Sequence, residues 1–425
     1  MNSFFQLVGF EYKKILKRKS TLAAVVLIGI LIASASLSSV TGKSYWHSDG
    51  NNISSFEAMK KDREVRRSTA GVIDEDYIVR AIQQNALMIA DDNNYFINNY
   101  GRFLKSSAYI KYALPYENAV NIINVAYESN FEAYATDGFY VFNSMTTPID
   151  TLELKDVKNF YPNIQKQALY KIATDPALTQ AEFQKHTEML EKVSVPFKTG
   201  YSVGYEKFLS LFDTVGLFVL LSVAICVAPV FAIEYQTKTD QLILSSKYGK
   251  NKVIWAKIFT GLSFTLIFSV ITIFVFLFTV LVLLGFDGGN VSIQVINPLT
   301  TYPMTIFKAC IVLSLVTVLA SLMFSMIAMV FSAVLKSSFG VIIVSFMFLF
   351  LPAFIVISPI NRLPYRLLQL FPIKMMSFSG VFSQYLFNIW GTTVTPAVFY
   401  SVFCIIVTVL VMPFAYGGFK NHQVG

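Results

Sequence analysis

Six long apolar stretches, none with an acidic or basic residue, constrain this 425-residue chain more than any other feature. A helix needs about 20 mostly apolar residues to cross the hydrocarbon core of a bilayer. Each stretch is long enough to do so, and together they predict an all-α polytopic membrane protein with six transmembrane helices. The stretches are residues 22–40, 215–233, 258–284, 309–335, 339–360 and 395–415.

The net charge of +8 is unevenly distributed. Residues 41–207 hold 18 Lys/Arg and 21 Asp/Glu, a net of −3, whereas the other 258 residues hold 16 and 5, a net of +11. The basic excess therefore belongs to the apolar part of the chain, as in a membrane protein with basic cytoplasmic loops. This distribution argues against nucleic acid as a partner.

Lys and Arg near short loops predict the orientation of the spans, because they are retained on the cytoplasmic side. The short loops on one side carry Lys13, Lys14, Lys17, Arg18, Lys19, Lys238, Lys247, Lys250, Lys252, Lys257, Lys336 and Lys420. The opposite short loops carry Arg362, Arg366 and Lys374, with Lys308 at the edge of a span. We therefore expect both termini in the cytoplasm and residues 41–207 as one extracytoplasmic domain.

Residues 1–20 predict an amphipathic helix before the first transmembrane helix, residues 21–40. Its apolar face comprises Phe4, Phe5, Val8, Tyr12, Ile15 and Leu16, and its lysines point away. Such a helix lies flat on an anionic inner leaflet, so lipid is an expected partner. An ordinary basic flank is one alternative. A signal peptide ending near Ala33-Ser34-Ala35 is another, although the apolar stretch continues to Val40.

The extracytoplasmic domain is predicted to be mainly helical. Apolar residues at helical spacing form two faces, which are Ile78, Ile82, Ala86 and Ile89, and Ile164, Ala168 and Ile172. Capping boxes are expected at Ser54–Glu57 and at Thr179–Glu182. The domain contains 14 of the 22 tyrosines, which fit either an aromatic binding surface or an aromatic core and membrane-interface belt.

Catalytic patterns are missing from the sequence. It has no H-E-x-x-H, G-x-S-x-G or phosphate-binding G-x-x-x-x-G-K-[ST] motif. His47, His186 and His422 are its only histidines, and we expect His186 to be a solvated residue on a helix. We therefore expect neither an enzyme nor a metal or cofactor site in this chain, and any ATP-driven work requires a separate subunit.

Small residues follow one face of the fourth apolar stretch at Ser321, Ser325, Ala328 and Ser332. Small side chains let membrane helices approach closely, so this face predicts helix packing. The alternative is a polar stripe that lines a translocation path.

The loop between the second and third stretches predicts a short cytoplasmic helix over residues 239–248. Thr239 is placed to begin it, Asp240 lies at its positive end and Lys247 in its last turn, and Gly249 is placed to end it. Leu242 and Ile243 would be exposed apolar residues able to dock into a groove of another protein. The alternative is an amphipathic loop on the lipid surface.

This loop resembles the coupling helix of ABC-2 type permeases, the transmembrane subunits of a class of bacterial ABC transporters. The matching residues are Glu234, Thr239, Leu242–Ser245 and Ala256-Lys257. Lys238 stands where the family usually has Gly, and Lys247 where Pro is common.

Two further segments agree with the resemblance. Residues 3–19, with Glu11-Tyr-Lys-Lys, are similar to the family's elbow helix. Residues 358–396, with apolar runs at 363–371 and 378–389, resemble the half-inserted outer helices that the family places between spans five and six. Domain 41–207 is similar only to the subset of the family with a large insert after span one.

The resemblance implies the permease subunit of an ATP-driven exporter in the bacterial plasma membrane. It implies a second permease, identical or not, and two ATPase subunits that hold ATP and Mg²⁺. The implied coupling residues are Glu234, Thr239, Asp240, Leu242, Ile243, Ser245, Lys247 and Lys257, and those of the elbow helix are Phe5, Val8, Glu11, Tyr12 and Ile15.

Three kinds of function remain open at this stage. The cargo of an exporter would be a peptide, an antimicrobial or a lipid-like molecule. Alternatively, the extracytoplasmic domain captures an antimicrobial peptide and the membrane part signals its presence. A Na⁺ or drug efflux permease of the same family is the third.

Overall fold

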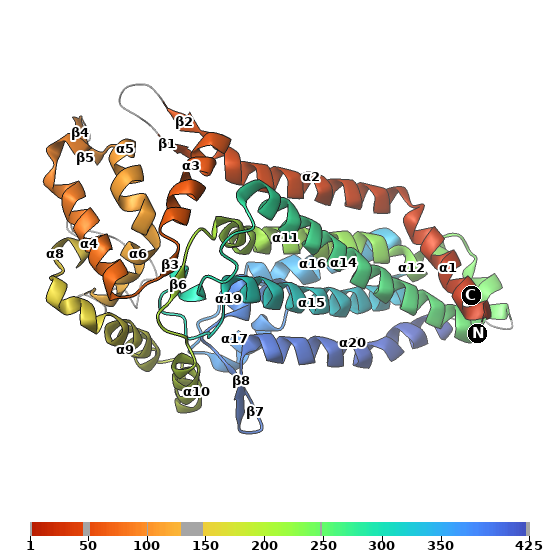
Figure 1. Ribbon diagram of the computed structural model, residues 1–425. Helices are drawn as coiled ribbons and strands as arrows, with labels where there is room; N and C mark the ends of the chain where they lie inside the picture. The colour runs from red at the N-terminus through yellow and green to blue at the C-terminus, as the bar shows by residue number, and fades with distance from the viewer. Residues whose placement is uncertain (1, 46–51, 100, 129–147, 247–248, 422–425) are drawn as a thin grey trace. The chain divides into compact units, whose positions relative to one another are not determined.

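The computed structural model describes residues 2–45, 52–99, 101–128, 148–246 and 249–421 (Figure 1). Contacts between residues divide the chain into two compact units. We call the first, Met1–Ala35 with Leu209–Thr279 and Ile311–Gly425, the membrane unit. The second, Ser36–Phe208 with Val280–Cys310, is the insert unit. The segment 280–310 thus packs with the large insert, whereas the sequence analysis assigned it to the part with the spans.

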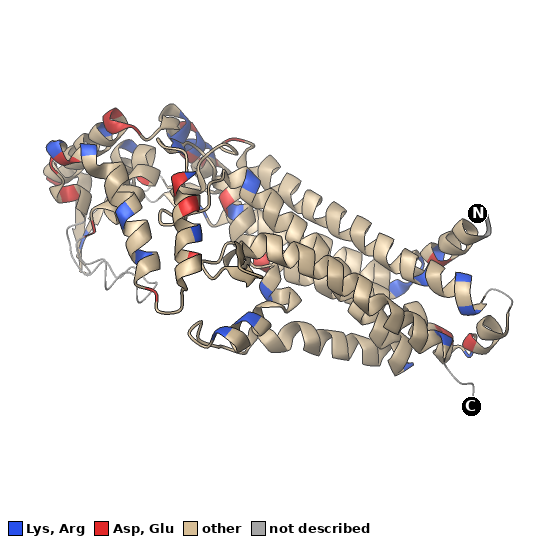
Figure 2. Cartoon of the chain, turned by 90° about the horizontal axis from the view of Figure 1, so that it is seen from below, with Lys and Arg blue, Asp and Glu red and all other residues tan. Residues whose placement is uncertain are grey.

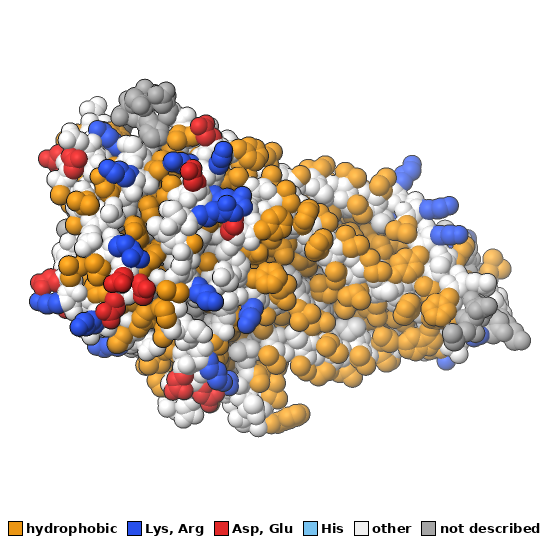
Figure 3. Space-filling model, viewed as in Figure 1, with side chains coloured by type: hydrophobic (Ala, Val, Ile, Leu, Met, Phe, Trp, Pro, Cys, Tyr) orange, Lys and Arg blue, Asp and Glu red, His pale blue; other side chains and the backbone are white. Residues whose placement is uncertain are grey.

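The described residues include five helical stretches long and apolar enough to cross a membrane. These stretches are Lys19–Thr41, Val203–Gln236, Gly249–Leu284, Ile306–Leu335 and Pro396–Lys420. The helices that form them are α2 (Lys19–Thr41), α11 (Val203–Val227), α12 (Pro229–Gln236), α14 (Ile254–Leu284), α15 (Ile306–Leu335) and α20 (Pro396–Lys420). Charged side chains are missing from most of their lengths (Figure 2). Hydrophobic side chains cover much of the visible surface of the membrane unit (Figure 3), as expected where lipid is the solvent.

The fifth predicted span, residues 339–360, is helical only in its first part. α16 (Ser338–Phe350) continues into a 3₁₀ turn (Leu351–Ala353), and residues 354–361 form no helix. Pro352 explains this end, because proline lacks an N–H and its ring opposes a continuing helix. The apolar helical stretch Ser338–Ala353 is about 24 Å long at 1.5 Å per residue. It is shorter than the hydrocarbon core, about 30 Å thick.

Residues 358–396 contain one of the two helices expected from their apolar runs. The first run forms α17 (Arg362–Gln369) and is followed by α18 (Pro372–Met375). The second run forms only a single turn, α19 (Phe378–Val381), and then an antiparallel hairpin of β7 (Phe387–Ile389) and β8 (Thr392–Val394). A helix over 378–389 is therefore wrong. Trp390 and Gly391, both with positive φ, form the two-residue turn of the hairpin.

The insert unit is mainly helical, with short antiparallel strand pairs. Its helices are α3 (Ser55–Ser68), α4 (Glu75–Ala90), α5 (Ser106–Ala108), α6 (Glu117–Ala126), α8 (Pro148–Thr151), α9 (Phe160–Ala173) and α10 (Gln180–Glu191). A π-helical turn (Tyr109–Ala113) and 3₁₀ turns (Asp92–Asn94, Leu114–Tyr116 and Leu154–Asn159) lie between them, and a further 3₁₀ turn (Ile293–Val295) lies in the segment 280–310. The strand pairs are β1 (Ser44–Tyr45) with β2 (Ile53–Ser54), β3 (Gly71–Val72) with β6 (Lys198–Thr199), and β4 (Tyr95–Asn98) with β5 (Gly101–Leu104).

Local sequence signals were realised to different degrees in this unit. The face of α9 is buried as expected, but α4 buries only the first half of its predicted face and leaves Ala86 and Ile89 exposed. The capping box at Thr179 and Glu182 is present. Ser54 does precede α3, but its side chain makes no capping hydrogen bond.

His186 on α10 is buried, contrary to the solvated position expected from the sequence. Its side chain is 1% exposed, and Nδ1 lies 2.7 Å from Oγ1 of Thr301. Thr301 belongs to the segment 280–310, whose packing within the insert unit the sequence did not indicate. The sequence did not indicate that the segment 280–310 packs with the insert, and this one omission accounts for both the different boundary of the unit and the unexpected burial of His186.

Asp287 attaches the same segment to α3 through two arginines. Its carboxylate accepts hydrogen bonds from Nε of Arg63 at 2.8 Å and from Nη2 of Arg67 at 2.5 Å. Gly288, with φ of 79°, follows directly, and a Cβ there would lie 2.1 Å from the carbonyl oxygen of Tyr201. The turn therefore requires glycine for both its backbone angle and its close approach.

Candidate functional site

The short helix between the second and third spans is the predicted coupling segment. It is α13 (Asp240–Ser245), and Thr239 directly precedes it, but the Thr239 side chain makes no capping hydrogen bond. The helix ends at Ser245, three residues before the predicted end, and Gly249 instead begins a π-helical turn (Gly249–Val253) that leads into α14. Lys247, the predicted last-turn residue, lies outside the described residues.

The predicted coupling residues differ sharply in exposure. Leu242 is 73% exposed and Ser245 is also exposed, so both are available to a partner. Ile243 is only half-buried and packs against the core of the membrane unit, so its predicted exposure is wrong in degree. Asp240 is buried. Leu242 therefore provides most of the exposed apolar surface of α13.

Lys238, just before α13, has a backbone φ of 55°. Residues with a side chain rarely adopt this left-handed conformation, whereas glycine does so at no steric cost. The resemblance to ABC-2 permeases places glycine at this position, and the backbone geometry gives a physical reason for that preference. The loop keeps the geometry even though lysine occupies the position.

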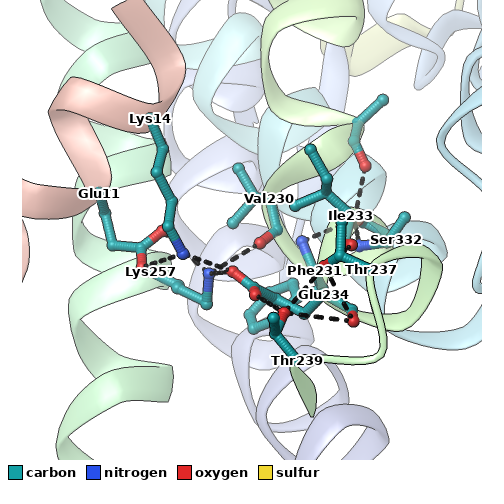
Figure 4. A network of polar contacts seen from close by, with 12 residues as sticks. Glu11, Lys14, Val230, Phe231, Ile233, Glu234, Thr237, Thr239, Lys257 and Ser332 are labelled. Carbon is teal, nitrogen blue, oxygen red and sulfur yellow. Dashed lines mark hydrogen bonds and ion pairs between the residues drawn. The ribbon is translucent and has the colours of Figure 1, made fainter. Parts of the chain in front are cut away.

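Three buried charged side chains and the half-buried Lys14 form an ionic network close to Thr239, the residue before α13 (Figure 4). Lys257 of α14 is fully buried, and its Nζ donates to Oε2 of Glu11 at 2.9 Å and to Oε1 of Glu234 at 2.7 Å. It also donates to the carbonyl oxygen of Val230 at 3.1 Å. Nζ of Lys14 reaches the same Glu234 oxygen at 2.7 Å. We call Glu11, Lys14, Glu234 and Lys257 the ion cluster.

The ion cluster connects three segments that are far apart in the sequence. Glu11 and Lys14 lie on α1 (Asn2–Leu16), Glu234 on α12 and Lys257 on α14. The other carboxylate oxygen of Glu234 accepts a hydrogen bond from Thr239, so the network continues to the residue directly before α13. Hydrogen bonds and ion pairs therefore join this residue to α12, α14 and α1.

The charges of the ion cluster balance, with two lysines and two glutamates. Burial is costly for each charge unless it is paired and hydrogen-bonded. For Lys14, burial alone would lower the pKa of the amine, but the carboxylates of Glu11 and Glu234 outweigh it and raise that pKa. Glu234 and Lys257 are 3% and 0% exposed, so both side chains lie inside the chain and not on its surface.

Ser332 of α15 supports the start of α12. Pro229 separates α12 from α11 and leaves backbone groups at the junction without their usual helical partners. The hydroxyl of Ser332 accepts from the amides of Phe231 and Ala232 at 3.0 and 2.9 Å and donates to the carbonyl of Ala228 at 2.6 Å. One side chain thus fixes the position from which Glu234 reaches the ion cluster.

The other residues of the small-residue stripe lie inside the membrane unit. All four stripe residues are fully buried. Ser325 accepts a hydrogen bond of 2.9 Å from Thr265 of α14, and Ser321 donates to the carbonyl of Thr317 at 2.8 Å. The Ser325 bond thus joins α15 to α14, whereas the Ser321 bond stays within α15.

The predicted elbow residues are on α1, with only some facing the protein. Val8, Glu11 and Ile15 are buried, Tyr12 is half-buried and bonds Ser263 at 2.7 Å, and Phe5 is exposed. Lys14, which the helical projection directed away from the apolar face, instead joins the ion cluster. The buried face of α1 is therefore partly ionic.

The sequence patterns pointed to Glu11, Glu234 and Lys257 separately but did not indicate that the three side chains are in contact. One feature of the sequence could have indicated this contact. Only five acidic residues lie outside 41–207, namely Glu11, Asp213, Glu234, Asp240 and Asp287. An acidic residue beside an apolar span requires a partner, so each of them was a candidate for an ion pair.

Comparison with known proteins identifies the family of this chain. A family model described as ABC-2 family transporter protein matches residues 6–422. Comparisons with curated proteins and with solved structures gave no significant match. Because the match spans nearly the whole chain, the protein belongs to the ABC-2 family and is a multi-pass membrane subunit of an ABC transporter, which works with ATPase partners.

Proposed function

We propose that this chain is the permease subunit of a bacterial ABC exporter and that α13 is its contact with the ATPase subunit. In this proposal the chain is not itself an enzyme, and ATP and Mg²⁺ are held by two ATPase subunits. Two permeases, identical or different, form the path for a peptide, an antimicrobial or a lipid-like molecule. The chain resides in the plasma membrane with both termini in the cytoplasm and residues 41–207 outside.

The observation that carries the proposal is the contrast between Leu242 and the residues behind it. An exposed leucine on a short helix is a suitable hydrophobic anchor for a groove on a partner. Thr239, the residue directly before this helix, donates a hydrogen bond to the buried Glu234. An outward contact is thus joined to an inward ionic network, as a coupling element requires.

Six crossings are supported by the positions of the helix ends. The last turns of α1 and α20 pack in one core cluster, so they lie at the same end of the membrane unit (Figure 1). Near that end, Ser338 at the start of α16 bonds Gln236 at 3.1 Å. At its other end, α16 packs against α18. We propose that α16 and the residues after it make a short sixth crossing, which returns the C-terminus to the side of the N-terminus.

In the same proposal α1 is the elbow helix on the cytoplasmic leaflet. Phe5, Phe10 and Leu16 are exposed and would enter the lipid, while Val8 and Ile15 face the protein. Glu11 and Lys14 then make α1 a part of the coupling device, because they bond the residues that hold α13.

Co-purification tests the proposal. The affinity-tagged chain, solubilised from the membrane of its own cell, is expected to retain an ATPase subunit whose ATP hydrolysis falls when the two are separated. The Leu242→Asp variant is expected to lose that subunit. The Gln241→Asp variant is the matched control, because it adds the same charge to an exposed neighbour on α13 and keeps the leucine. If the Leu242→Asp chain retains the ATPase fully, α13 is not the contact.

A further inference from the structure

The hairpin β7–β8 has an unusual residue at its tip. Trp390 is fully exposed and has a φ of 48°, and Gly391 follows with a φ of 85°. Ile389 pairs with Thr392, so Trp390 and Gly391 form the whole turn. A two-residue turn with two positive φ angles strongly prefers Asn, Asp or Gly at its first position. A bulky side chain there is uncommon and is strained.

The Gly391 amide donates to Oδ1 of Asn388 at 3.1 Å and so holds the turn, but the fully exposed Trp390 side chain gains no packing against the described residues that would offset its strain. The base of the hairpin, in contrast, is firmly held. Phe387 stacks on Phe399 of α20 with ring centroids 3.9 Å apart, and Arg366 of α17 donates to the carbonyl of Leu386 at 2.8 Å. A rigid base therefore presents a strained aromatic tip to something outside the chain.

We propose that Trp390 anchors the hairpin in the headgroup region of the leaflet at the N-terminal end of α20. Figure 1 shows the hairpin projecting sideways from that end of the helix, across the direction of the spans. Val398 and Val402, on the first turns of α20, are exposed, so the surface that faces lipid reaches the base of the hairpin. The tip thus lies where a bilayer would have its interface.

The chemistry of the tip and its surroundings favours lipid as the occupant. Indole has an apolar body and one N–H donor, and tryptophan is accordingly enriched at membrane interfaces. Residues 351–395 contain Arg362, Arg366 and Lys374 and no acidic residue. This charge is complementary to anionic phospholipid headgroups. The proposal concerns lipid contact alone and does not depend on transport or on an ATPase.

Fluorescence of the full-length chain in proteoliposomes tests the anchor. Trp46 and Trp255 are replaced by Phe, which leaves Trp390 as the only tryptophan. The vesicles contain phosphatidylglycerol and a phosphatidylcholine brominated either near the glycerol end or near the methyl end of its acyl chains. The expected result is loss of most of the Trp390 emission with bromine near the glycerol end, and a smaller loss with bromine near the methyl end.

A second comparison keeps the test decisive if the double Phe variant does not fold. The quenching of the unmodified chain is compared with that of Trp390→Asn, in which Asn-Gly suits the turn and the hairpin is retained. The difference in quenching between the two chains is the contribution of Trp390. Absence of quenching by either lipid overturns the proposal. Emission typical of water would then place the tip in solvent, and blue-shifted emission would place it against a second protein chain.

Discussion

Lys257 and Glu11 are 246 positions apart in the sequence, yet Nζ of the lysine lies 2.9 Å from Oε2 of the glutamate in a fully buried contact. The pair fastens α1 to α14, and through Glu234 it also reaches α12 and Thr239. Replacing Lys257 by Met should therefore do more than remove one bond. It leaves the ion cluster with one unbalanced negative charge on two carboxylates that are largely buried.

We expect Lys257→Met to lower the free energy of unfolding by about 3 kcal/mol, the low end of the range for breaking a buried pair. The low end applies because Lys14 still contacts both carboxylates. The measurement is unfolding of the purified chain in mixed micelles with increasing dodecyl sulfate. Lys250→Met, a change of the same kind at an exposed position, is the control and should alter stability by less than about 0.5 kcal/mol.

The double variant Lys257→Met, Glu11→Gln is expected to be more stable than Lys257→Met alone. Removing the second charge restores a neutral cluster, and a neutral amide is far less costly to bury than an unpaired carboxylate. If the two substitutions are instead simply additive in their cost, the charges do not interact in the folded chain and the cluster is not the unit described above.

The spans were largely predictable from the sequence, because an uncharged apolar run of 20 residues has few alternatives in a membrane protein. The prediction of the helices failed where a proline or a pair of turn residues interrupts an apolar run. Pro352 ends α16 within the apolar run 339–360, and Trp390-Gly391 turns the second outer run into a hairpin. Apolar composition alone does not distinguish these outcomes from a long helix.

The site was only partly predictable, for a different physical reason. The signals for α13 are local, and the structure places the helix within a few residues of the prediction. The ion cluster and the bond between His186 and Thr301 depend on residues more than 100 positions apart. Periodicity and capping patterns carry no information about such pairs. Exposure was misjudged for the same reason at Ile243, which packs against the core of the membrane unit.

Lys238→Gly is expected to stabilise the chain by about 1 kcal/mol. The lysine occupies a left-handed conformation that costs an L-residue about 1–2 kcal/mol, and the greater freedom of glycine in the unfolded chain offsets part of the gain. Thermal unfolding of the purified variant measures the change. Lys238→Ala removes the same side chain but keeps the unfavourable φ, so it should have no stabilising effect. Equal effects of Gly and Ala would mean that the strain is not the cause.

Asp287 should make the stability of the insert unit depend on pH in the acid range. Partial burial would raise the pKa of its carboxyl group, but hydrogen bonds from Arg67 and Arg63 outweigh burial and lower that pKa. A carboxyl group whose pKa is lowered by folding stabilises the folded chain at pH values above its pKa in the unfolded chain, which is about 4. This contribution is lost as the pH falls through the lowered pKa of the folded chain.

We therefore expect Asp287→Asn to be less stable than the unmodified chain at neutral pH, by roughly 1 kcal/mol or less because the pair is partly exposed. The difference should vanish as the pH falls below the lowered pKa of Asp287. Unfolding at a series of pH values measures it. Asp92→Asn, at a more exposed ion pair with Arg102, should show almost no difference at any pH. A difference in stability between Asp287→Asn and the unmodified chain that persists in acid would contradict a stabilising role for the charge of Asp287.

Leu242 is exposed and its neighbour Ile243 on α13 is half-buried, so the same substitution should have different effects at the two positions. Leu242→Asp places a charge on an exposed site, so we expect the unfolding midpoint to change little while coupling is lost. Ile243→Asp places the charge against the core of the membrane unit and should lower the free energy of unfolding by about 2–3 kcal/mol. Unfolding in mixed micelles and the ATP hydrolysis that co-purifies with each variant provide the two measurements. A Leu242→Asp chain that unfolds as readily as Ile243→Asp would show that α13 has a structural role, and full ATP hydrolysis co-purifying with Leu242→Asp would exclude α13 as the coupling contact.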